Sequence, residues 1–215
     1  MSAEEISDVM LRLERAGAHN VNFVTPTHYI PTVRSAIIDA RAKGLSVPIV
    51  YNTGSYDSPE ALKTLRGLVD IYLPDFKYYL PRTAEKYSRA KSYPEAAKAA
   101  IAEMYSQVGG FAMGGDGMLR RGVVIRILLL PGHIAEAKLT LGYLYDTYGD
   151  SVYFSLMSQY TPLEDMDKPL DRRVTREEYR QLTEYAERLG ITRCFVQDID
   201  SAKEAYIPSF NGVEV

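Results

Sequence analysis

The chain has 215 residues, with 25 Lys plus Arg against 28 Asp plus Glu and a net charge of −3. This length predicts one domain, and the nearly balanced charge argues against a nucleic-acid-binding protein. The longest apolar stretch, 123–130, contains Arg126 and is far shorter than the roughly 20 residues of a membrane helix, so no membrane span is expected. The acidic segment 1–9 lacks the pattern of a signal peptide, which predicts a cytoplasmic protein.

Cysteine is almost absent. Cys194 is the single cysteine of the sequence, which excludes an internal disulfide framework. It equally excludes a zinc or iron–sulfur site built from cysteines of this chain alone.

Apolar periodicity predicts helices and strands that alternate along the chain. Ser2 and Glu5 form a capping box for a first helix that Gly17 ends. The sequence then predicts strand 21–24, a helix with Pro31 in its first turn and Gly44 beyond its end, strand 47–51, short helix 59–65, strand 71–73, helix 93–108, strand 123–130, helix 134–148, strand 152–157, helix 175–190 and strand 194–196.

Strands that alternate with long helices imply parallel crossovers, so the predicted class is α/β with a parallel sheet or barrel. Several strands are continuous apolar runs, as expected where both faces of a sheet are buried. The glycine-rich turn 114–117 predicts a small hairpin before strand 123–130. A (β/α) barrel normally opens with a strand, whereas this chain opens with a helix.

Polar residues follow five of the predicted strands. Because loops at the carboxyl ends of parallel strands converge, these residues predict a site at that edge of the sheet. The segments are Thr25-Pro26-Thr27-His28, Asn52-Thr53-Gly54, Asp75-Phe76-Lys77, Pro131-Gly132-His133 and Ser158-Gln159-Tyr160.

Arg126 lies in the middle of an apolar strand, where an unpaired charge is costly. It therefore either has an anionic partner, for which a carboxylate ligand or Asp75 would serve, or points into a polar cavity. Asp75 and Lys77 are two residues apart and share a face in an extended segment. They form a simple ion pair, or Lys77, desolvated at the carboxyl edge of the sheet, acts as a Schiff-base nucleophile.

The remaining polar residues have two readings each. His28 either caps the following helix or bonds a backbone carbonyl, or it binds a ligand, and His133 is expected to begin a helix rather than to bind a ligand. Asn52 and Thr53 form a simple turn or offer oxygens to an amino group, a ribose or a cation. The sequence has no GxGxxG, P-loop, HExxH or GxSxG motif, so the corresponding standard functions lack support.

Six segments in order along the chain resemble radical S-adenosylmethionine (SAM) proteins related to the pyruvate formate-lyase activating enzyme. They are GAHNVNFVTPTHYIP (17–31), VYNTGSY (50–56), DIYLPDFKYY (70–79), RRGVVIRILLLPGH (120–133), SLMSQYTP (155–162) and FVQ (195–197).

The resemblance implies a partial parallel (β/α) barrel that holds a [4Fe-4S] cluster and SAM at its carboxyl mouth. Such proteins cleave SAM reductively to a 5′-deoxyadenosyl radical, and activating enzymes use it on a glycine of a partner enzyme. The implied partners are a glycyl-radical enzyme and a reductant such as flavodoxin. The implied SAM-binding positions are Thr25, Thr27, His28, Asn52, Thr53, Asp75, Lys77 and Arg126.

The sequence departs from the family in three respects. The usual glycine-glycine-glutamate is replaced at 25–28, Ile127 stands where relatives often carry a histidine, and the cluster motif is missing. The family binds its cluster through CxxxCxxC after the first strand, and this motif is absent. We therefore expect residues 1–197 to form a truncated radical SAM core without the first strand and cluster loop, followed by an irregular tail, 198–215. Such a chain would not bind the cluster alone and would be inactive alone, and strand 21–24 would form an open edge that favours dimerisation. The alternatives are a small Schiff-base lyase or aldolase that uses Lys77, and a non-catalytic scaffold.

Overall fold

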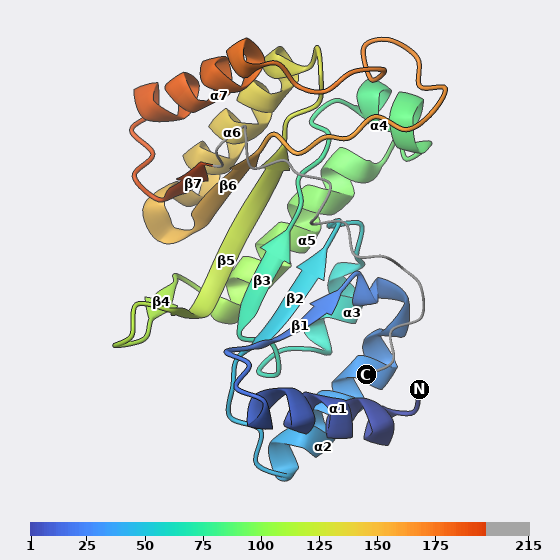
Figure 1. Cartoon of the computed structure of the whole chain (residues 1–215), viewed down its shortest axis with the longest axis vertical. Coiled ribbons are helices and arrows are strands. Elements are labelled where there is room, and N and C mark those ends of the chain that lie inside the picture. The colour runs from blue at the N-terminus through green and yellow to red at the C-terminus, as the bar shows by residue number, and fades with distance from the viewer. Residues whose placement is uncertain (197–215) are drawn as a thin grey trace.

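The computed structural model describes residues 1–196, so Gln197 and the predicted tail 198–215 lie outside the described residues. Figure 1 shows how the helices and strands alternate along the chain. The helices are α1 (Ala3–Arg15), α2 (Ile30–Ala42), α3 (Pro59–Lys63), α4 (Pro81–Ser88), α5 (Tyr93–Val108), α6 (Ile134–Tyr148) and α7 (Arg176–Arg188), with short 3₁₀ turns η1 (Pro26–Tyr29) and η2 (Gly149–Ser151). The strands are β1 (Val21–Val24), β2 (Ile49–Thr53), β3 (Ile71–Pro74), β4 (Ala112–Met113), β5 (Leu119–Leu128), β6 (Tyr153–Met157) and β7 (Cys194–Val196).

The strands form one sheet in the order β1-β2-β3-β5-β6-β7. Every neighbouring pair along this path is parallel, and β4 pairs antiparallel with the start of β5. The predicted α/β class, the parallel sheet and the small hairpin are therefore confirmed. Because the strands on this path all run in the same direction, their carboxyl ends lie along one edge of the sheet.

Several predicted elements agree closely with the structure. The Ser2 capping box is present at the start of α1, and a second capping box, between Thr175 and Glu178, begins α7. The helices of 93–108 and 134–148 and the strands of 21–24 and 194–196 have the predicted bounds.

Strand β2 differs from its prediction, because it covers Ile49–Thr53 rather than 47–51. Pro48 has no amide hydrogen to donate to a neighbouring strand. At the other end, Asn52 is opposite Val24 on one side and Leu73 on the other, so pairing extends the strand. Asn52 and Thr53 are therefore strand residues and not a turn.

Helix α4 has no counterpart in the sequence prediction. Its N-cap residue, Leu80, makes no side-chain capping bond. The cap comes instead from Glu136 of α6, whose carboxylate accepts hydrogen bonds from the amides of Tyr79 and Leu80, both at 2.9 Å, and from the Thr83 hydroxyl at 2.7 Å. A cap supplied from more than 50 residues away leaves no local sequence signal.

The two faces of the sheet are unequal. Tyr51, Tyr72 and Ile125 point to one face and are fully buried, and α5 packs there, since Tyr72 donates a hydrogen bond to Gln107 of that helix. The other face is less covered at the ends of the sheet, where β6 alternates between buried and half-buried residues and Val24 of β1 is exposed. The prediction that both faces are buried therefore holds only for the central strands.

Within residues 1–196, no helix combines the length and the apolar character needed to cross a membrane.

Candidate functional site

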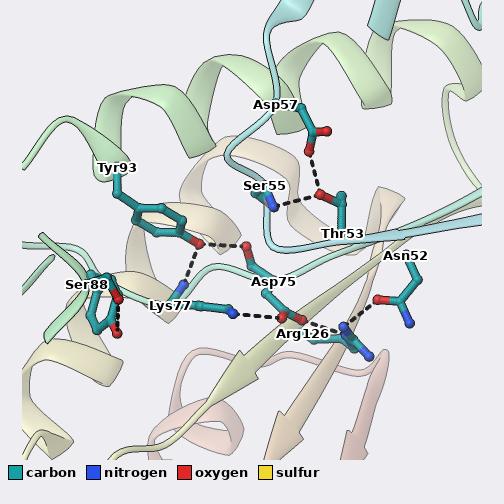
Figure 2. Close-up of polar contacts among 10 residues, drawn as sticks. Asn52, Thr53, Ser55, Asp57, Asp75, Lys77, Ser88, Tyr93 and Arg126 are labelled. Atoms are coloured by element: carbon teal, nitrogen blue, oxygen red, sulfur yellow. Dashed lines mark hydrogen bonds and ion pairs between the residues drawn. The ribbon is translucent and has the colours of Figure 1, made fainter. Parts of the chain in front are cut away.

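Three neighbouring strands bring their polar side chains together at the carboxyl edge of the sheet. Arg126 of β5 donates from Nε to Oδ1 of Asp75 at 2.7 Å and from Nη2 to Oδ1 of Asn52 at 2.6 Å (Figure 2). Asp75 directly follows β3, and Asn52 is the penultimate residue of β2. The side chains of Asp75 and Arg126 are 23% and 25% exposed, so the cluster is accessible to a ligand.

Lys77 adds a second cation to this cluster. Its Nζ lies 3.8 Å from Oδ2 of Asp75, and its side chain is 44% exposed. Figure 2 shows Lys77 and Arg126 approaching the Asp75 carboxylate from its two sides. Two cations around one carboxylate leave a net positive charge, which favours an anionic ligand.

Tyr93, at the start of α5, fixes the segment between Asp75 and Lys77. Its hydroxyl donates to the Asp75 carbonyl at 3.0 Å and accepts from the Lys77 amide at 2.9 Å. Burial raises the pKa of Tyr93 well above its usual range, so this phenol keeps its proton, and with it the bond to the Asp75 carbonyl, in alkaline as well as in neutral solution.

Asp75 is under opposing influences. Burial raises the pKa of its carboxyl group, while the positive charges of Arg126 and Lys77 lower it. The net direction is upward. The carboxylate therefore depends on its two cationic neighbours to remain ionised in this position.

Thr53 does not join this cluster. Successive strand residues point to opposite faces, and Thr53 is buried on the side opposite Asn52, where its hydroxyl hydrogen-bonds Asp57. The hydroxyl of Tyr51 also donates to Asp57, at 2.8 Å. These buried bonds anchor the loop after β2 beneath the sheet.

Two residues just beyond strand ends have left-handed backbones. Thr25 follows β1 with φ +52°, and Ser55 lies two residues after β2 with φ +64°. Both are uncommon for residues other than glycine, and such strain is concentrated at functional sites. Ser55 is fully buried and its Oγ has no hydrogen-bond partner within the described part of the chain.

The segment after β1 lies beside the cluster through its backbone, because the Thr25 amide donates to the Asn52 carbonyl at 2.8 Å. Thr27 and His28 belong to the 3₁₀ turn η1, and His28 is exposed. His133 precedes α6, as predicted for a helix-start residue, and its Nε2 lies 2.8 Å from the Tyr87 hydroxyl.

Of the eight predicted site residues, the structure thus joins Asn52, Asp75, Lys77 and Arg126 through side chains. The sequence reasoning missed Tyr93 and Asp57. The position of Asp57, an acidic residue shortly after the polar segment 52–54, was a signal that could have identified it. Nothing in the neighbouring sequence marks Tyr93, because its partners are backbone groups 16 and 18 residues away.

The residues described do not fit an iron–sulfur cluster. No group of three His, Cys, Asp or Glu residues that could hold a metal occurs within 1–196. Burial raises the pKa of the Cys194 thiol to about 11, which disfavours the thiolate that an iron ligand needs.

No family model matches the chain. The chain is similar to the uncharacterized protein MJ0674 of Methanocaldococcus jannaschii, with 26% identity over 186 residues, or 85% of this chain and 50% of that protein. The chain therefore spans about half the length of this relative.

Proposed function

We propose that the cluster of Asn52, Asp75, Lys77 and Arg126 binds the amino-acid end of SAM. The observation that carries the proposal is the arrangement of two cations and one carboxylate at the carboxyl ends of adjacent parallel strands. The amino-acid end of SAM is a zwitterion, with a carboxylate for the cations and an ammonium group for Asp75.

The chemistry of the donors fits this ligand. Arg126 uses one N–H on Asp75 and another on Asn52, and a guanidinium has further N–H groups to donate to a carboxylate. Lys77 is part-exposed beside them. The role of these residues is to bind and orient the ligand, while Asp75 holds both cations in place.

In the wider form of the proposal, the chain is part of a radical SAM protein related to the pyruvate formate-lyase activating enzyme. In such a protein SAM supplies, when bound next to a reduced cluster, a radical that removes a hydrogen atom from a substrate. The thiolates for that cluster would have to come from outside these 215 residues, which contain a single cysteine.

Calorimetric titration with SAM, S-adenosylhomocysteine and adenosine tests the first step. We expect SAM and S-adenosylhomocysteine to bind more tightly than adenosine, which lacks the amino-acid end. Arg126→Gln should weaken SAM binding roughly tenfold, the loss expected for a hydrogen bond to a charged group.

Arg121→Gln is the matched control, because Arg121 lies in the same strand, is exposed, and is near the opposite end of β5. It should leave SAM binding unchanged. Equal affinity for adenosine and SAM, or SAM binding that Arg126→Gln and Asn52→Ala leave unchanged, would show that the cluster does not bind the amino-acid end.

A further inference from the structure

An open pocket of about 340 Å³ lies beside Lys77, between the loops that follow β2 and β3 and the turn from α4 to α5. We call it the tyrosine pocket. Its volume lies in the range of small-molecule sites. The residues that define its chemistry are Tyr56, Tyr78, Tyr93, Lys77, Ser88 and Arg89.

The three tyrosines form fixed aromatic walls. The ring of Tyr93 lies 6.0 Å from that of Tyr56 and 5.5 Å from that of Tyr78, measured between centroids. Each hydroxyl is held, by Ser92 at 2.7 Å for Tyr56, by Ser88 at 2.9 Å for Tyr78, and by backbone groups for Tyr93. With the hydroxyls engaged, the rings offer mainly their carbon surfaces to a ligand.

Tyr56 is the accessible wall. It is 53% exposed, whereas Tyr78 and Tyr93 are 9% and 4% exposed. An exposed ring that is held by both a hydroxyl bond and a neighbouring ring loses little freedom when a planar group stacks on it.

The charged residues of the pocket are both cations. Arg89 is the C-cap residue of α4. Its amide donates to the Glu85 carbonyl at 3.0 Å and the next amide, of Ala90, donates to the Ala84 carbonyl at 3.3 Å, which fixes the backbone there. The guanidinium makes no hydrogen bond or ion pair with the other residues of 1–196. The Lys77 ammonium group already pairs with the Asp75 carboxylate, at 3.8 Å. Arg89 therefore supplies most of the uncompensated positive charge of the pocket.

From this combination we propose that the tyrosine pocket binds a planar aromatic anion, with the ring stacked on Tyr56 and the anionic group on Arg89 and Lys77. A carboxylate and a phosphate share the required chemistry, since both accept hydrogen bonds from a guanidinium. The ligand is a second one, next to the proposed SAM site. Lys77 borders both sites, whereas Tyr56 and Arg89 belong to the tyrosine pocket alone, so the test rests on these two residues.

Ligand-observed NMR titrations with three probes test this proposal. Benzoate and phenyl phosphate carry the two anionic groups, and benzamide is a neutral molecule of similar shape. We expect at least one anion to bind roughly tenfold more tightly than benzamide, the usual gain from a charge-assisted hydrogen bond. The stronger of the two identifies the preferred anionic group.

Variants assign the binding to the pocket. Arg89→Gln should reduce the affinity for the anion to that for benzamide, and Tyr56→Ala should weaken both. Arg82→Gln is the matched control, because Arg82 is also exposed on α4 but does not line the pocket, and it should change neither. Circular dichroism checks that each variant is folded.

The proposal fails if benzamide binds as tightly as both anions, if no probe binds, or if Arg89→Gln leaves the affinity for the anion unchanged. SAM titrations of the same variants separate it from the proposed function. Arg89→Gln should leave SAM binding intact, so loss of probe binding with retained SAM binding supports the second site alone.

Discussion

Asp75 and Arg126 are joined twice, through the backbone and through the side chains. The two residues form a parallel β-bridge, with the Phe76 amide donating to the Arg126 carbonyl at 2.9 Å. Their side chains meet at 2.7 Å. The backbone pairing therefore fixes the ion pair, and the cation needs little further ordering to bind a ligand.

Arg126→Gln should destabilise the chain by about 1–2 kcal/mol, because it removes a charge-assisted hydrogen bond and leaves Asp75 without its closest cation. Urea unfolding measures the loss, and Arg121→Gln should have a small effect. A variant as stable as the wild type would show that the ion pair contributes nothing.

The same variant should change the pH dependence of stability. Without Arg126 the pKa of Asp75 rises further, since one of the two charges that lower it is gone. A raised folded-state pKa gives stability that is present at low pH and is lost as the pH rises through that pKa. The deficit of Arg126→Gln should therefore grow between acid and neutral pH, and adding Asp75→Asn should abolish that growth.

The contribution of Glu178 to folding stability should have the opposite pH dependence. Hydrogen bonds from Arg172 hold the pKa of Glu178 far below its usual range, assisted by the amides of Thr175 and Gly132. Stability from a lowered pKa is present above the unfolded value of about 4.3 and is lost as the pH falls. Glu178→Gln should cost about 1–3 kcal/mol at pH 7 and much less in strong acid.

The neighbouring Glu177 is the control for this measurement. It pairs with Arg180, but both side chains are more than half exposed, and exposed pairs contribute about 0–1 kcal/mol. Urea unfolding at several pH values should therefore show a small effect of Glu177→Gln. An equal loss from both variants would contradict a special role for Glu178.

Asn22→Pro tests whether β1 is an open edge. Within residues 1–196, β1 pairs with β2 alone, and the amides of Val21 and Thr25 donate to it. By the alternation of a strand, the Asn22 amide points away from β2, so proline there breaks no bond within the sheet. We expect the variant to fold and to reduce any concentration-dependent dimer seen by analytical ultracentrifugation.

Val21→Pro is the comparison, since it removes the 3.0 Å hydrogen bond from the Val21 amide to the Pro48 carbonyl and should destabilise the domain. A wild-type chain that stays monomeric at high concentration, with the Asn22 amide strongly protected from hydrogen exchange, would contradict the open edge.

Lys77 should not form a trapped Schiff base. Amines that act as such nucleophiles are desolvated, whereas the Lys77 side chain is 44% exposed and paired with Asp75. Borohydride reduction in the presence of small aldehydes and ketones, followed by mass spectrometry, should give no adduct at Lys77 above the level at other exposed lysines. A specific adduct would revive the lyase alternative.

The sequence determined the parts of this protein that depend on short-range patterns. Apolar periodicity and capping residues indicated α1, α5, α6 and α7, and helices between strands required a parallel sheet. Once the strands are parallel, their carboxyl ends share an edge, so the place of the candidate site also followed. The single cysteine of the sequence likewise showed, without a structure, that these residues cannot supply the three thiolates of an iron–sulfur site.

The tertiary structure decided which side chains meet. Arg126 had two possible partners by sequence, and the pairing of β3 with β5 selected Asp75, 51 residues away. Strand β2 extends two residues beyond its predicted end, through Asn52 and Thr53. This pairing places the Asn52 side chain on the face that carries Arg126 and the Thr53 side chain on the buried face. Helix α4 depends on Glu136. These outcomes rest on strand register and contacts between distant segments, because a shift of one residue reverses the face of every side chain in a strand.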